Sequence, residues 1–133
     1  SGGGVGDPHP YSTSYASSKT GLMRLTEGLA KEVESHHVKV FAVGPPAIRT
    51  AMTEFLMDDD GAKQWRPTFG NIFDEGRDAS PELVSECILN LLSGQADRLS
   101  GRFIDPKLDF ELLLEDMDRI LEDDLWTLRI RGR

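Results

Sequence analysis

The chain has 133 residues, of which 38% are apolar and 29% charged, so it is predicted to be one soluble globular domain with a single core. A net charge of −8 argues against nucleic acid as the main partner, because phosphates require a positive surface. No membrane span and no signal peptide are expected, since no apolar run approaches about 18 residues and the first ten residues carry no positive charge. One cysteine, Cys87, excludes an internal disulfide framework and favours a reducing, cytoplasmic location.

The first third of the chain is predicted to form a loop, a long helix and a strand. Residues 1–13 are rich in glycine, proline and serine, which is typical of a loop. A helix is predicted over 14–35, with Ser14 as its N-cap. The run 38–43 is short, apolar and β-branched, which indicates a strand covered on both sides, as in a parallel sheet. The residues expected on the apolar face of the helix recur at spacings of three and four: Leu22, Leu25, Leu29 and Val33.

A long excursion is predicted to follow this strand. Residues 50–57 are expected to form a short helix that begins at Thr50. The stretch 58–79 mixes aspartates and glycines with isolated aromatic residues, and we expect one short helix within it. Long excursions in compact domains are often lids or binding loops. Aromatic residues recur every four positions here, which favours lid or core packing over a ligand-binding cage: Trp65, Phe69 and Phe73.

The last part of the chain is predicted to contain a helix, a strand and a helix. The serine and proline at 80–81 start a helix that Gly94 ends. Residues 101–105 are expected to form a second strand, 108–121 a final helix with an acidic solvated side, and 125–133 a short extended segment. Strands that alternate with helices indicate an α/β fold with a parallel sheet. Two strands are few for such a sheet, so the chain is predicted to be part of a larger one.

The sharpest local feature is a tyrosine and a lysine four positions apart, Tyr15 and Lys19, at the start of the predicted helix. Residues at this spacing share a helix face. An ammonium beside a phenol favours the phenolate, and such a phenol can give or take a proton at a carbonyl or carbinol. In most helices a pair at this spacing is only a solvated surface pair, so its meaning depends on its context.

That context resembles the short-chain dehydrogenase/reductase family. The matching pieces are Ser-x-x-Gly at 1–4, Tyr-x-x-x-Lys at 15–19 within YASSKTGL, and a segment at 45–50 similar to the family's Pro-Gly-x-Ile-x-Thr loop. They occur in the family's order, and the later SPELV and LSGRFI segments also fit. The resemblance implies the C-terminal part of a Rossmann-like doubly wound parallel sheet. Residues 1–133 would then form a single partial domain that lacks the N-terminal dinucleotide-binding half.

The resemblance also implies a role for each matching residue. Tyr15 is the expected catalytic acid/base, Lys19 favours its phenolate and binds the nicotinamide ribose, and Ser1 orients the substrate. Backbone groups of Ile48 and the hydroxyl of Thr50 are expected at the nicotinamide carboxamide. The implied reaction is hydride transfer between NAD or NADP and a small-molecule alcohol or carbonyl substrate. The implied cofactor-binding residues are Tyr15, Lys19, Pro45, Pro46, Ile48 and Thr50.

Three departures from the family pattern keep a second hypothesis open. The spacing from Ser1 to Tyr15 is one residue longer than is common in the family. Pro46 stands where the family has a glycine, and proline fixes φ and removes an amide donor. The glycines at 2–6 do not form the dinucleotide-binding motif Gly-x-Gly-x-x-Gly. Asp7 occupies the position of the motif's last glycine, and no strand comes before these glycines. The alternative is a truncated, catalytically silent chain that acts only through association.

Association itself is expected through the helix 14–35, because its apolar arc is wider than the predicted sheet can cover and the family packs this helix against a partner subunit. The result would be a homo-oligomer. No metal site is expected: the histidines at 36–37 follow a helix end, where a cation suits the helix dipole. Cys87 lies between apolar helix positions and is predicted to be a buried small hydrophobe.

Overall fold

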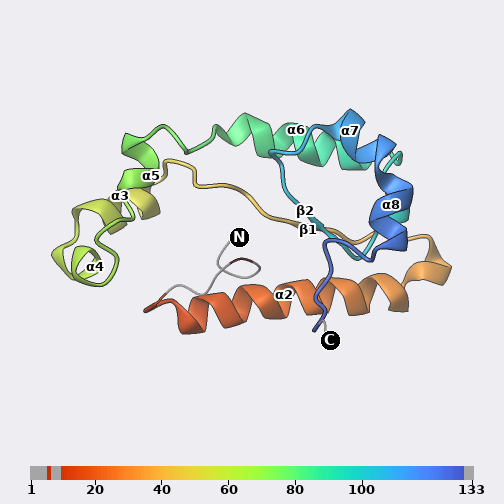
Figure 1. The fold of residues 1–133 in the computed structure, drawn as a ribbon, viewed down its shortest axis with the longest axis horizontal. Helices are drawn as coiled ribbons and strands as arrows, with labels where there is room; N and C mark the ends of the chain where they lie inside the picture. The colour runs from red at the N-terminus through yellow and green to blue at the C-terminus, as the bar shows by residue number, and fades with distance from the viewer. Residues whose placement is uncertain (1–5, 7–9, 131–133) are drawn as a thin grey trace.

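The computed structural model describes residue 6 and residues 10–130, and Figure 1 shows their arrangement. Helices lie on both sides of a short pair of strands: α2 on one side, α6 to α8 on the other, and α3 to α5 beyond one end. In chain order the elements are α2 (Thr13–Glu32), the 3-10 turn η1 (Glu34–His36), β1 (Ala42–Val43), α3 (Ala51–Asp58), α4 (Asp60–Trp65), α5 (Asn71–Asp74), α6 (Pro81–Leu92), the 3-10 turn η2 (Asp97–Leu99), β2 (Phe103–Ile104), α7 (Phe110–Glu115) and α8 (Met117–Glu122).

The two strands pair in parallel, with Ala42 opposite Phe103 and Val43 opposite Ile104. This confirms an α/β fold with a parallel sheet. The paired ladder is shorter than the predicted strand 38–43, because the start of that segment is held by a turn instead. There the Val40 N–H donates to the Ser100 hydroxyl at 3.0 Å, and the Gly101 N–H donates to the Val40 carbonyl at 2.7 Å.

The buried face of α2 differs from the predicted one. Met23 and Ala30 are the buried apolar residues of the helix, whereas Leu25 on the predicted face is 62% exposed. The helix meets the sheet along the line of Met23 and Ala30 because Gly101, in the turn before β2, lets it approach closely. A Cβ at Gly101 would lie only 3.2 Å from the Cβ of Ala30.

Several helix boundaries differ from the predicted ones. The α2 helix begins one residue before Ser14, with Ser12 as the N-cap. The excursion 58–79 contains two short helices, α4 and α5, where one was expected. The predicted final helix 108–121 is divided at Asp116 into α7 and α8. Helix ends are where a local apolar pattern gives the weakest information.

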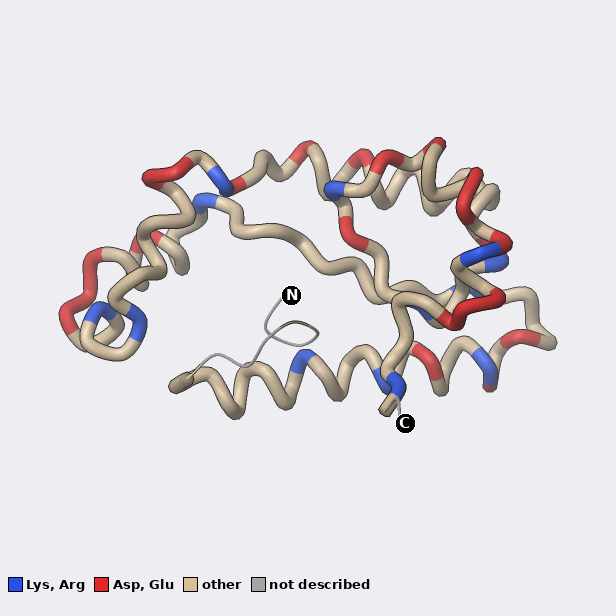
Figure 2. The backbone as a smooth tube through the Cα atoms, viewed as in Figure 1, with Lys and Arg blue, Asp and Glu red and all other residues tan. Residues whose placement is uncertain are grey.

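The core lies between the sheet and the helices α6, α7 and α8. Leu99 and Ile120 are its largest fully buried side chains, and Ile104 of β2 joins it. Cys87 is partly buried against this cluster, which agrees with its predicted packing role. Figure 2 shows that acidic residues recur along α6 to α8. In the described part of the chain, no helix combines the length and apolar character needed to cross a membrane.

Candidate functional site

The tyrosine and lysine singled out in the sequence lie together on the first turns of α2. The Lys19 Nζ atom is 5.5 Å from the centroid of the Tyr15 ring, within the range of a cation–π contact. Tyr15 is 49% exposed and Lys19 is half-buried, so the ring is accessible from solvent. The arrangement therefore offers a phenol with a cation beside it at an open surface.

The turn that carries this pair is held by its own hydroxyl groups. Ser18 donates to the Tyr15 carbonyl at 2.7 Å, and Thr20 donates to the Ala16 carbonyl at 2.9 Å. Serine and threonine hydroxyls commonly bond to a carbonyl one turn earlier in a helix. The hydroxyls of Ser18 and Thr20 are thus satisfied within the helix that carries Tyr15 and Lys19.

The loop 45–50 follows β1 and leads into α3. Thr50 caps α3: the Thr53 N–H donates to its hydroxyl at 3.3 Å, and the Thr50 N–H donates to the Thr53 hydroxyl at 2.7 Å. The Thr53 hydroxyl also donates to the Ile48 carbonyl at 3.1 Å. The Thr50 hydroxyl is therefore part of a capping box. The sequence analysis predicted a contact of this hydroxyl with nicotinamide and did not predict the cap.

Two positions of this loop differ in the backbone donors that they offer. Pro46 is half-buried and has no N–H to donate. The Ile48 N–H makes no hydrogen bond to any other described residue, whereas the carbonyl of the preceding Ala47 accepts from the Ala79 N–H at 2.9 Å. The Ile48 N–H is thus a donor without a described partner, whereas the carbonyls of Ala47 and Ile48 already accept hydrogen bonds.

Chain direction brings the pair and the loop to the same end of the sheet. In Figure 1, α2 runs opposite to β1, so its first turns lie toward the end where β1 finishes and the loop 45–50 begins. Open α/β sheets bind ligands outside the carboxyl ends of their strands. Tyr15, Lys19 and the loop 45–50 occupy that side of the molecule, whereas the predicted Ser1 lies outside the described residues.

An aromatic pair that the sequence analysis did not identify connects this end of α2 to the excursion. The rings of Tyr11 and Trp65 lie with their centroids 5.0 Å apart and tilted by 56°. Tyr11 has a φ of 64°, a conformation that non-glycine residues seldom adopt, and it lies one turn before Tyr15. The available sequence signal was a tyrosine directly after a proline in the predicted loop 1–13, which carries no long-range information.

The remaining aromatic residues of the excursion pack on one another and under arginines. Phe69 and Phe73 are in edge contact at 5.9 Å, with Arg66 at 4.9 Å from the Phe69 ring and Arg49 at 5.0 Å from the Phe73 ring. Phe73 is buried. These contacts agree with the predicted packing role of Phe69 and Phe73.

Two surface grooves are lined by other parts of the chain. The larger, of about 1070 Å³, runs between the second half of α2, the turn before β2 and the C-terminal segment; the other, of about 500 Å³, lies between α6 and α7. Tyr15 and Lys19 line neither groove. Cys87 faces the smaller one, and burial, with a smaller effect from Asp105, raises the pKa of its thiol. A raised pKa lowers the share of thiolate, which is the nucleophilic form of the side chain.

Known proteins share the sequence pattern of this end of the molecule. A family model described as short chain dehydrogenase matches residues 1–61. The chain is 35% identical to the 3-oxoacyl-(acyl-carrier-protein) reductase FabG of Thermotoga maritima over 96 residues, which is 72% of this chain and 37% of that protein. It belongs to the short-chain dehydrogenase family. No solved structure matches it significantly.

Other relatives in the short-chain dehydrogenase family cover different shares of the chain. The short chain dehydrogenase citE of Monascus ruber is 28% identical over 121 residues, 91% of this chain and 37% of that protein. Carbonyl reductase family member 4 of Xenopus laevis is 36% identical over 78 residues, 59% of this chain and 30% of that protein. The chain spans about a third of the length of these relatives. That residues 1–133 form a single partial domain stays a prediction.

Proposed function

We propose that the chain contributes the proton-transfer centre of an NAD(P)-dependent oxidoreductase, with Tyr15 as its acid/base. The observation that carries the proposal is the Tyr15–Lys19 pair, with a cation 5.5 Å from the centroid of an accessible phenol ring. The names of the relatives support the same class, since they are reductases and dehydrogenases. They do not favour the alternative of a catalytically silent chain.

The residues present fit the nicotinamide end of such a cofactor in part. The Ile48 N–H is a backbone donor without a partner among the described residues, and in this proposal Lys19 would bind the ribose hydroxyls. Pro45 and Pro46 line the same loop without amide donors, and Thr50 must share its hydroxyl with the cap of α3. The printed sequence contains no glycine-rich phosphate loop of the Rossmann type.

In this proposal the chain's own residues move one proton and hold the substrate. A bound nicotinamide supplies or accepts the hydride. In the direction of reduction, Tyr15 Oη donates its proton to the substrate oxygen; in the direction of oxidation, the phenolate takes the proton of the hydroxyl. Lys19 stabilises the phenolate by its charge. Ser1 donates a hydrogen bond that orients the substrate oxygen.

We also infer that the substrate is a small alcohol or carbonyl compound and that the chain forms a homo-oligomer through α2 in the cytoplasm. The relatives' names support the substrate class, because they include a 3-oxoacyl reductase and a carbonyl reductase. The exposed apolar face of α2 supports association: Leu22 is half exposed and Leu25 more so. The single cysteine supports a reducing compartment.

The test is oxidation of NADPH or NADH by a panel of carbonyl compounds, measured with the protein at its full natural length. We expect Tyr15→Phe to lower kcat by at least about 100-fold, because a positioned general acid contributes at least that much. Cofactor affinity should change little, since the ring stays in place. Lys19→Ala should lower both kcat and cofactor affinity.

The matched control is Tyr11→Phe, which removes a phenol hydroxyl one turn away on an exposed ring. We expect this variant to keep the wild-type kcat within about twofold, because Tyr11 acts through its ring contact with Trp65. Turnover by Tyr15→Phe equal to that of wild type, or an equal loss in both tyrosine variants, would remove Tyr15 from the mechanism.

A further inference from the structure

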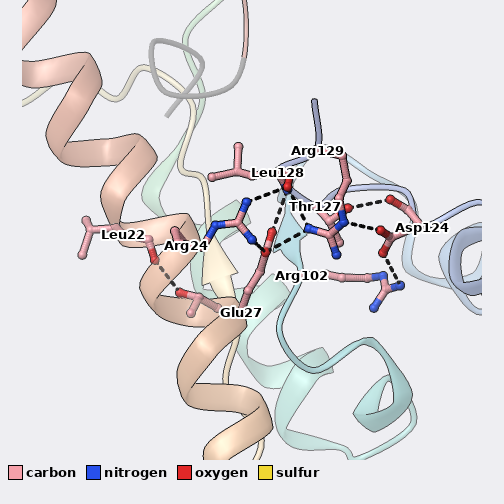
Figure 3. Close-up of polar contacts among 9 residues, drawn as sticks. Leu22, Arg24, Glu27, Arg102, Asp124, Thr127, Leu128 and Arg129 are labelled. Carbon is pink, nitrogen blue, oxygen red and sulfur yellow. Dashed lines mark hydrogen bonds and ion pairs between the residues drawn. The ribbon is translucent and has the colours of Figure 1, made fainter. Parts of the chain in front are cut away.

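Most arginines that the structure describes pair with a carboxylate. Figure 3 shows one group of such pairs, at the C-terminal segment 124–130. Glu27 of α2 accepts there from the Leu128 N–H at 2.6 Å and from Arg129 Nη1 at 3.0 Å. Asp124 joins the same group, with its Oδ2 2.5 Å from Arg129 Nε. The arginines paired with an aspartate or a glutamate are Arg24, Arg77, Arg98, Arg102, Arg119 and Arg129.

Arg49 and Arg66 differ from these, because each lies over a phenylalanine ring and makes no ion pair within the described part of the chain. The guanidinium carbon of Arg49 is 5.0 Å from the ring centroid of Phe73, and that of Arg66 is 4.9 Å from the ring centroid of Phe69. Asp74 directly follows Phe73 in the sequence and still forms no ion pair with Arg49. Contact with a ring, and not with an acid, therefore positions both cations.

The two rings belong to one cluster, so the two cations lie in the same part of the molecule. Phe69 and Phe73 are in edge contact with their centroids 5.9 Å apart, and Phe73 is buried. A cation–π contact engages the charge of a guanidinium and none of its N–H donors. These donors lie in one plane, a geometry that matches the oxygens of a carboxylate or a phosphate. The cluster thus presents two guanidinium groups on an aromatic support.

Arg49 belongs to the loop 45–50, which follows the carboxyl end of β1. It lies directly between Ile48, whose N–H has no partner among the described residues, and Thr50, the cap of α3. Figure 1 shows that the excursion with α3 to α5, to which Arg66 belongs, lies beyond this end of the strands. Ligands of open α/β sheets bind outside this end. Both arginines are therefore on the side of the molecule where the proposed substrate binds.

We propose that Arg49 and Arg66 bind an anionic oxygen group, a carboxylate or a phosphate, on the substrate of the Tyr15 centre. The inference rests on the proposed function and adds the substrate class, which is an anionic carbonyl compound or alcohol. The anion is assigned to the substrate and not to the cofactor, because the rings of Phe69 and Phe73 belong to the excursion and not to the sheet. The two arginines hold the substrate in this proposal and take no part in proton transfer.

The first test follows the reaction of single arginines with phenylglyoxal, which modifies guanidinium groups, by mass spectrometry of the peptides. It uses the wild-type protein at its full natural length, without cofactor. We expect acetate or inorganic phosphate to slow the modification of Arg49 and Arg66 by about fivefold or more at high anion concentration, because a bound oxyanion occupies their N–H donors. Protection by acetate indicates a carboxylate site, and protection by phosphate alone indicates a phosphate site.

This test contains its own controls. Arg98 and Arg119 are exposed, and each pairs with a single aspartate, so neither anion should change their rate of modification. Chloride at the same ionic strength measures screening and should not protect Arg49 or Arg66. Acetamide, a neutral analogue of acetate, should not protect them either. NADPH or NADH alone should also leave both arginines reactive, since the anion is assigned to the substrate.

The second test compares ketones that differ in charge: acetoacetate with methyl acetoacetate, and dihydroxyacetone phosphate with dihydroxyacetone. We expect Arg49→Gln to lower kcat/KM for the charged ketone by about tenfold or more, because the variant removes hydrogen bonds between charged groups. The value for its neutral partner should stay within about twofold of wild type. Arg119→Gln is the matched control, an exposed arginine outside the cluster, and it should change neither value.

Three results would overturn the proposal. These are equal effects of the anions on Arg49 and Arg119, protection of Arg49 by the cofactor alone, and an unchanged preference for the charged ketone in Arg49→Gln. Failure of the proposed function looks different. If no carbonyl compound is reduced while acetate or phosphate still protects Arg49 and Arg66, the proposed function fails and the anion site remains.

Discussion

Gly101→Ala is expected to destabilise the fold by about 2–4 kcal/mol, since it combines backbone strain with overpacking. Gly101 has a φ of +91°, which an L residue rarely adopts. Its new Cβ would lie 3.2 Å from the Ala30 Cβ and 3.8 Å from the Glu27 Cα, so α2 would have to move away from the sheet by a few tenths of an ångström. Because Glu27 lies on that line of contact, the shift would also loosen the C-terminal segment.

The assay is urea unfolding followed by far-UV circular dichroism and tryptophan fluorescence, whose coincidence establishes two-state behaviour. Gly28→Ala is the matched control, because nothing lies within 4 Å of a Cβ built at that exposed helix position. It should stabilise the fold by about 0.5–1 kcal/mol, as alanine does in a helix interior. A Gly101 variant as stable as wild type, or a shift of the same sign in both variants, would refute the packing argument.

Two further predictions concern single contacts. Replacing Tyr11 by glycine removes the ring that contacts Trp65 and relieves the positive φ of this position. In a Trp126→Phe background, where Trp65 is the remaining tryptophan, its fluorescence should then shift to the red. An unshifted spectrum would show that the two rings are apart in solution. Hydrogen bonds from the Glu82 backbone N–H and, to a smaller extent, from the Ser80 hydroxyl lower the pKa of the Glu82 carboxyl. The stability that this carboxylate contributes at the start of α6 is therefore present above the ordinary carboxyl pKa. It is lost as the pH falls through the lowered pKa. Ser80→Ala should raise that pKa in an NMR titration, and an unchanged midpoint would exclude the hydroxyl as a cause.

Local patterns determined the elements that need only neighbouring residues. The spacing of apolar residues predicted α2, and the serine and proline at 80–81 predicted the start of α6. The β-branched run 38–43 and the short segment 101–105 predicted a parallel pair. The four-residue spacing of Tyr15 and Lys19 placed them on one face, because 3.6 residues make a helical turn. The sequence therefore predicted that these two side chains lie together, whereas their catalytic roles stay predictions. The assignment of Ser1 and of the cofactor contacts stays a prediction.

Tertiary structure decided what depends on residues far apart. The leucine stripe of α2 was visible in the sequence, but Gly101 determines that the helix packs along Met23 and Ala30 instead. Glu27 and Leu128 are 101 positions apart, and no periodicity links a carboxylate to an amide at that distance. A helix or strand pattern records which faces a segment can bury, whereas the partner that buries them is chosen by packing and hydrogen bonding of the whole chain.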